Sequence, residues 1–158
     1  MKSERTLILF NIMDGDCAFE DALLGMIANT IVANCLSSDY FHASLDGDAI
    51  VNLGLNPERL WCVSTNKKEQ CFRAIIVEGH DVVGIIERLL GPADLKVARS
   101  MAPGSIRGQF LSRALVHSSK TAEAAEIEIE KISPFLSKTA KTPKDAIKRI
   151  PSFRKLRS

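Results

Sequence analysis

The chain has 158 residues, of which 46% are hydrophobic and 25% charged, and these proportions are ordinary for one globular domain. No apolar run approaches the roughly 20 residues of a membrane-spanning helix, and the apolar part of the N-terminal segment MKSERTLILF is too short for a signal peptide. The cysteines form no CxxC pair. The sequence therefore predicts neither a zinc site nor a disulfide framework, and a reducing, cytoplasmic compartment is expected.

The formal net charge of +2 hides an uneven distribution. Residues 138–158 hold eight Lys or Arg and one Asp, which gives +7, whereas residues 1–137 hold 13 basic and 18 acidic residues, which gives −5. We therefore expect a domain over residues 1–137 and a basic C-terminal tail over residues 138–158.

A basic tail on an acidic body predicts an anionic partner. Nucleic acid, an acidic protein surface such as a filament, and an anionic membrane are the candidates, and the alternative is a tail that only adds solubility. Docking on a partner is favoured because apolar residues stand between the charges of the tail: Ala146, Ile147, Ile150, Phe153 and Leu156.

Apolar runs and helical periodicities predict an α/β fold. In chain order, we expect a strand over 5–12, a helix over 19–28, a strand over 30–36, a helical hairpin over 39–53, an extra strand over 60–64, a strand over 72–77, helices over 81–90 and 95–101, a strand over 114–116 and a helix over 122–132. Apart from the weaker segments, this order is strand, helix, strand, strand, helix, strand. It is typical of the ferredoxin-like sandwich, in which helices pack on a four-stranded antiparallel sheet.

Residues 101–132 hold the side chains best suited to chemistry. A Pro-Gly turn at 103–104 precedes Arg107, and the short apolar run 114–116 ends on His117, just before the helix expected over 122–132. Helix N-termini and arginines both favour bound anions, so an imidazole beside them can take up a phosphoryl group. The alternative is a structural histidine packed at the end of a strand.

These motifs resemble the active-site region of the nucleoside diphosphate kinase family. That family carries a P-G-T-I-R-G loop, an N-x-x-H-G-S-D-S segment whose His is phosphorylated, and an A-E-x-E-I helix. The matching segments here are PGSIRG at 103–108, HSS at 117–119 and AEIEI at 125–129. Upstream, DG at 14–15 resembles the end of the family's K-P-D-G motif and EG at 78–79 its strand-ending E-G. GPAD at 91–94 resembles the G-P-T-D form of divergent members, including those of cilia and flagella.

The resemblance implies a phosphohistidine mechanism. His117 would attack the terminal phosphate of a nucleoside triphosphate such as ATP and then pass the phosphoryl group to a nucleoside diphosphate. Glu128 would hold the imidazole, and Ser119 would support Glu128, so these three are the catalytic candidates. Arg107 and Arg88 are the phosphate-binding candidates. Magnesium would arrive with the nucleotide, bridging its phosphates rather than sitting in a protein cage.

The chain also departs from the family's nucleotide-binding pattern. Ile12 stands in place of the lysine of K-P-D-G, Ala114 in place of an asparagine, and Ala93 in place of a threonine. The family's second phosphate-binding arginine falls on Glu87, so Arg88 is one position away. Losing one preorganised donor typically costs about 10²–10³ in rate. These losses predict a pseudoenzyme with weak or no phosphotransfer.

Three functions follow as hypotheses. The first is a degenerate kinase-like domain that serves as a structural or interaction module in a larger assembly, cytoskeletal or ciliary. The second is a working kinase in which Arg88 or a tail lysine replaces the lost cation. The third is nucleic-acid binding through the tail, which the acidic body and the lack of a base-reading motif disfavour. The family's dimers and hexamers also imply a homo-oligomer.

Overall fold

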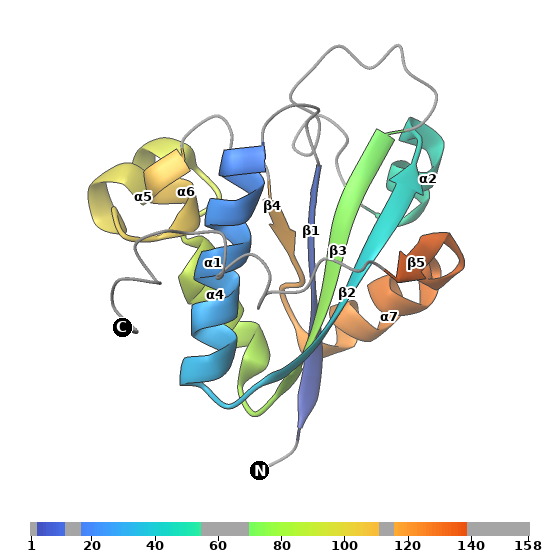
Figure 1. Ribbon diagram of the computed structural model, residues 1–158, viewed down its shortest axis with the longest axis horizontal. Helices are drawn as coiled ribbons and strands as arrows, with labels where there is room; N and C mark the ends of the chain where they lie inside the picture. Colours follow the sequence, from blue (N-terminus) through green and yellow to red (C-terminus); the bar gives the residue numbers. More distant parts are fainter. Residues whose placement is uncertain (1–2, 12–16, 55–69, 111–115, 139–158) are drawn as a thin grey trace.

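The computed structural model describes residues 3–11, 17–54, 70–110 and 116–138, and they are built around one antiparallel sheet (Figure 1). Its five strands lie in the order β4-β1-β3-β2-β5. Their bounds are β1 Glu4–Asn11, β2 Ser37–Leu45, β3 Gln70–Gly79, β4 Val116–Ser118 and β5 Leu136–Lys138. The order of the first four strands is that of the ferredoxin-like sandwich, so the predicted α/β fold class is confirmed. The fifth strand, at the edge beside β2, was not predicted.

Helices cover both faces of the sheet (Figure 1). Helices α1 and α4 pack on one face, while α2 and α7 pack on the other. Helices α5 and α6 and the 3-10 helix η2 complete the described elements. The bounds are α1 Cys17–Ala33, α2 Gly47–Asn52, α4 Val82–Leu90, α5 Leu95–Met101, α6 Ile106–Phe110, α7 Ala122–Ile132 and η2 Ser133–Phe135.

The central strand β1 supplies both cores. Successive side chains of a strand point to opposite faces of the sheet. Ile8 and Phe10 therefore pack with α1 and α4 on one face, and Leu7 and Leu9 pack with α7 on the other. All four are at most 2% exposed. A continuous apolar run is the pattern expected of such a strand, which is why the sequence predicts it well.

Most of the expected elements are confirmed. The helix expected over 19–28 is α1, those over 81–90 and 95–101 are α4 and α5, and that over 122–132 is α7. The strands expected over 5–12 and 72–77 are β1 and β3. The extra strand expected over 60–64 lies outside the described residues, as do residues 139–158 of the tail. Among the described residues, no helix is long and apolar enough to cross a membrane.

The strand predicted over residues 30–36 is wrong. Helix α1 continues through Ala33, and the chain turns at Cys35, which has a positive φ of 55°, before β2 begins at Ser37. The β-branched residues Ile31 and Val32 suggested a strand. However, Ile31 shares the buried side of α1 with Ile27, and this burial outweighs the local β preference.

The helical hairpin predicted over residues 39–53 is also wrong in its first half. Residues 37–45 form β2, and a helix begins only at α2. All nine residues of β2 pair with β3, whose sequence lies some thirty residues away. Pairing of this kind is decided by a distant partner, so the local pattern of β2 did not reveal it.

Candidate functional site

Strand β4 places His117 at the edge of the sheet. Its three residues pair antiparallel with β1, and His117 lies opposite Leu9. Just beyond the strand, the Ser119 amide donates to the Leu7 carbonyl (3.2 Å), and the Leu7 amide donates to Ser119 Oγ (3.2 Å). These two bonds continue the pairing with β1. The backbone on both sides of His117 is therefore held in one position.

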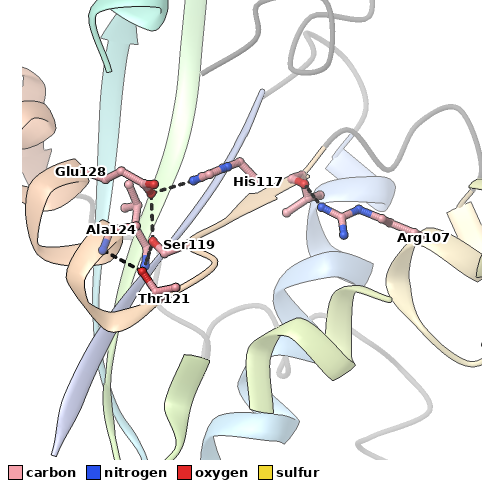
Figure 2. A network of polar contacts seen from close by, with 8 residues as sticks. Arg107, His117, Ser119, Thr121, Ala124 and Glu128 are labelled. Atoms are coloured by element: carbon pink, nitrogen blue, oxygen red, sulfur yellow. Dashed lines mark hydrogen bonds and ion pairs between the residues drawn. The ribbon is translucent and has the colours of Figure 1, made fainter. Parts of the chain in front are cut away.

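A short polar relay joins β4 to α7 (Figure 2). His117 Nε2 lies 2.7 Å from Glu128 Oε1, and Ser119 Oγ donates to the same oxygen at 2.9 Å. The side chains of His117 and Glu128 are 19% and 14% exposed, and Ser119 is fully buried. An ionised carboxylate only accepts hydrogen bonds, so Nε2 is the donor when Glu128 is ionised. In that tautomer of the neutral imidazole, the free lone pair lies on Nδ1.

Helix α7 presents Glu128 to His117 because of how it starts and packs. Thr121 caps its N-terminus, accepting from the Ala124 amide at 3.0 Å (Figure 2). Ala125, Ile129 and Ile132 recur at helical spacing and are buried against the sheet. Glu128 follows Ala125 by three residues, so it lies at the border of this buried stripe. Its carboxylate therefore reaches the sheet edge where His117 stands.

Arg107, expected to bind phosphate, donates to two backbone carbonyls. Nη1 donates to the Gly91 carbonyl (2.6 Å), which ends α4, and Nη2 donates to the Val116 carbonyl (2.7 Å), directly before His117 (Figure 2). The residue is half-buried on α6. Charge-assisted bonds of this length are strong. In this structure Arg107 ties the end of α4 to the start of β4.

The turn before Arg107 is folded tightly against the end of α4. Ser105 Oγ donates to the Ala102 carbonyl (2.7 Å) and accepts from the Gly108 amide (3.1 Å). Gly91 has a φ of +84°, and a Cβ there would clash with Ser105. Glycine alone adopts this positive φ without strain and has no Cβ to clash with Ser105. Gly91 of the GPAD segment therefore shapes the backbone that Arg107 holds.

Arg88, the other phosphate-binding candidate, is not brought to the relay. Its guanidinium pairs with Asp81 at 3.5 Å, with the two side chains 70% and 68% exposed. Asp81 stands at the N-terminal end of α4, whereas the other end, at Gly91, is the one linked to β4 through Arg107. Helical side chains point back toward the N-terminus, in agreement with this direction. The structure thus brings together His117, Glu128 and Ser119, with Arg107 behind them.

Of the three positions that depart from the family pattern, the structure describes Ala93. Ala93 is exposed in the turn before α5, next to Asp94, which caps that helix by accepting from the Lys96 amide (2.9 Å). Ile12 and Ala114 lie outside the described residues. Within the part of the chain that the structure describes, no group of three His, Cys, Asp or Glu side chains is arranged to hold a metal ion.

The sequence analysis did not predict one polar cluster. Arg73, 1% exposed on β3, donates to Glu20 Oε1 of α1 through Nη2 (2.6 Å) and Nε (3.1 Å), and Nη2 also lies 3.2 Å from His42 Nε2 of β2. Burying a charge is costly unless it is paired, so this ion pair ties α1 to the sheet. A signal was present in the sequence, because Arg73 interrupts the apolar run 72–77.

Comparison with known proteins gives a consistent picture. The protein-family model described as nucleoside diphosphate kinase matches residues 64–135. The nucleoside diphosphate kinase of Aquifex aeolicus (strain VF5) is 37% identical over 59 residues, which is 35% of this chain and 42% of that protein. The nucleoside diphosphate kinase of Streptomyces griseus is 42% identical over 67 residues, which is 40% of this chain and 47% of that protein. In these matches the chain spans less than half the length of either relative.

The similarity in structure extends further along the chain. A crystal structure of the Aquifex aeolicus nucleoside diphosphate kinase superposes with a TM-score of 0.59, covering 86% of this chain and all of that one, at 24% identity. At this level of identity the likeness shows a shared fold. It covers a larger share of the chain than the sequence comparisons match.

Proposed function

We propose that this chain, which matches the nucleoside diphosphate kinase family model over residues 64–135, is a degenerate, kinase-like domain of that family. In this proposal His117 accepts a phosphoryl group slowly, and the domain serves mainly as a structural or interaction module in a larger assembly. One observation carries the proposal. The relay of His117, Glu128 and Ser119 is formed, while Arg107, the described arginine expected to bind phosphate, is bonded to backbone carbonyls.

The relay supports phosphoryl uptake at Nδ1. The lone pair of His117 Nδ1 attacks the terminal phosphorus of a magnesium-bound nucleoside triphosphate, an N–P bond forms, and the bond to the bridging oxygen breaks to release the diphosphate. Positive charge builds on the ring as it reacts. Glu128, 2.7 Å from Nε2, stabilises that charge and keeps the proton on Nε2. Ser119 holds the Glu128 carboxylate in position.

The surroundings of the relay support a slow reaction. Phosphoryl transfer depends on cations and donors already aimed at the phosphates. Arg107 would have to leave two backbone carbonyls to reach a phosphate, and Arg88 pairs with Asp81 at the far end of α4. Ile12, Ala93 and Ala114 supply no donor from their side chains. Binding and transfer are therefore both weakened.

The family resemblance also suggests a ligand and an oligomeric state. Its members bind nucleotides and often oligomerise, so we propose a nucleoside triphosphate with its magnesium as ligand and a homo-oligomer as an available state. The basic tail, residues 138–158, is proposed to meet an acidic protein surface or filament rather than nucleic acid. A cytoplasmic location associated with the cytoskeleton or a cilium fits a module of this kind.

The test is phosphate uptake from labelled ATP with magnesium. The nucleoside diphosphate kinase of Aquifex aeolicus is assayed in parallel as a competent relative. We expect acid-labile label on His117 that forms, and passes to a nucleoside diphosphate, at least about 10³-fold more slowly than in that relative, because several donors are missing. Absence of any label would contradict the proposed role of His117.

The second candidate is a working nucleoside diphosphate kinase, and the intact relay of His117, Glu128 and Ser119 favours it. The same assay separates the two candidates. Transfer within about tenfold of the Aquifex aeolicus enzyme, a difference of about 1.4 kcal/mol in the barrier, would replace the degenerate domain with the active enzyme.

A further inference from the structure

An acidic groove lies on the α7 face of the sheet, away from the relay. A cavity of about 410 Å³ is formed there by β2, β3, α7, η2 and β5. Its apolar lining comes from Phe41, Ile76, Ile129 and Leu136. A second cavity, of about 550 Å³, adjoins it at Arg5 and Glu78 and continues along the start of α7. We refer to the two cavities together as the acidic groove.

Negative charge dominates this groove. Among the described residues, five carboxylates and one guanidinium line it: Glu4, Asp39, Glu78, Glu123 and Glu126, with Arg5. Arg5 is already bonded to Glu126 by two bonds of 2.6 and 3.0 Å, and it holds the pKa of Glu126 below its ordinary value. The remaining carboxylates give the groove a surplus of negative charge. A ligand that fits must combine cationic and apolar groups.

The register of β5 fixes how its three residues align with β2. Leu136 pairs with Ala43, the following residue with His42, and Lys138 with Phe41. Continued in the same register, the next four residues of the chain would meet Tyr40, Asp39, Ser38 and Ser37. Within the described part of the chain, these four residues of β2 pair only with β3. Three of them, Ser37, Ser38 and Asp39, line the groove.

The sequence beyond Lys138 suits this path. It reads TAKT and then Pro143, so four residues able to pair are followed by a proline. Proline cannot donate to a ladder and commonly marks the end of pairing. In the continued register Pro143 would come one residue beyond Ser37, where β2 begins. Beyond it, the residues up to Ser158 alternate six basic residues with Ile147, Ile150, Phe153 and Leu156, and Asp145 is the one acid among them.

We propose that residues 139–158 of this chain occupy its own acidic groove. Residues 139–142 extend β5 along Tyr40 to Ser37, and the basic segment after Pro143 crosses the carboxylates, with its apolar side chains toward Phe41 and Ile76. In this arrangement the tail covers the open edge of β2. It also withholds its positive charges from any other anionic partner until that partner competes for them.

Several weak interactions together would hold the tail in the acidic groove. Each exposed ion pair contributes only about 0.2–1 kcal/mol, and its contribution falls with salt. The segment is, however, tethered at Lys138 to the groove that it enters, and a short tether supplies an effective concentration on the order of millimolar. A foreign basic peptide must pay the full cost of association. The chain's own tail is therefore the favoured occupant.

The first experiment cross-links lysines directly to carboxylates in the full chain at low protein concentration and maps the products by mass spectrometry. We expect links from Lys144 and Lys148 to Glu78, Glu123 or Glu126 in the monomer. The double variant Lys144→Glu, Lys148→Glu should lose these links. Lys96→Glu is the matched control, since Lys96 is exposed on α5, and it should leave them unchanged. Links found only between two copies, or only to other surfaces, would overturn the proposal.

The second experiment measures hydrogen exchange of the amides of residues 37–40 that point away from β3. In Ala140→Pro, the pairing predicted for residues 139–142 is broken, and exchange should become roughly tenfold faster. Ala146→Pro is the matched control, because it lies beyond Pro143 and should leave the strand extension in place. Equal exchange in the unmodified chain and in Ala140→Pro would mean that the edge is open, and the proposal would fail.

Discussion

A charged side chain lies on each side of His117, and the two side chains make different kinds of contact. On the α7 side, Glu128 binds the imidazole itself, and Ser119 binds Glu128. On the α6 side, Arg107 binds the backbone of the strand that carries His117. The first arrangement sets the chemistry of one nitrogen. The second sets only the position of the strand.

This difference teaches that a motif can persist while its task differs. The PGSIRG segment resembles the family's P-G-T-I-R-G loop, yet its arginine donates to the Gly91 and Val116 carbonyls. The His117, Ser119 and Glu128 contacts, by contrast, are those that the proposed phosphoryl uptake at Nδ1 would use. Substitutions on the two sides should therefore act on different measurements, activity on one side and stability on the other.

The largest effect is expected at the nucleophile. His117→Ala should lower phosphate uptake from labelled ATP by at least about 10³-fold, because removing a nucleophile typically abolishes most of the rate. Melting temperature should change little, since His117 is partly exposed and at a sheet edge. Label that persists in His117→Ala would place the chemistry on another residue.

Glu128→Gln tests the relay on the α7 side. A hydrogen bond to a charged group contributes about 1.5–3 kcal/mol, so uptake should fall roughly tenfold to a hundredfold. Initial rates of label incorporation are the measurement. Glu130→Gln is the matched control, since Glu130 is exposed on the same helix, and it should keep the full rate. An unchanged rate in Glu128→Gln would remove the carboxylate from the mechanism.

Arg107→Met tests the α6 side. Two partly buried carbonyls would lose their donors, and the free energy of unfolding should fall by about 2 kcal/mol in a urea titration. Arg99→Met, at an exposed arginine of α5, should change it by less than about 0.5 kcal/mol. If Arg107→Met keeps its stability and loses only nucleotide binding, the arginine serves phosphate rather than the backbone.

Arg88→Met should have the smallest effect. Its pair with Asp81 is exposed, and pairs of this kind contribute about 0–1 kcal/mol. The free energy of unfolding should fall by no more than about 1 kcal/mol, and the initial rate of phosphate uptake should stay within about twofold of that of the unmodified chain. A large loss of uptake would show that Arg88 turns toward the relay when nucleotide binds, and the second candidate function would gain support.

Much of this protein was readable from its sequence, where the signal is local. The apolar run of β1, the helical spacing of Ala125, Ile129 and Ile132 in α7, and the glycine turns all reflect contacts made within a few residues. Their periods follow from the geometry of strands and helices. The fold class and the family resemblance were predicted from such segments, together with the order in which they occur.

Tertiary structure alone decided the remaining points, because distant partners set them. Residues 30–33 are helical since Ile31 packs with Ile27, and residues 37–45 are a strand since β3 pairs with them. Arg73 is buried because α1 brings Glu20 to it. The direction of Arg107 depends on two carbonyls 16 and 9 residues away. A sequence specifies which donors a chain carries, and only the folded chain determines which acceptor lies within reach.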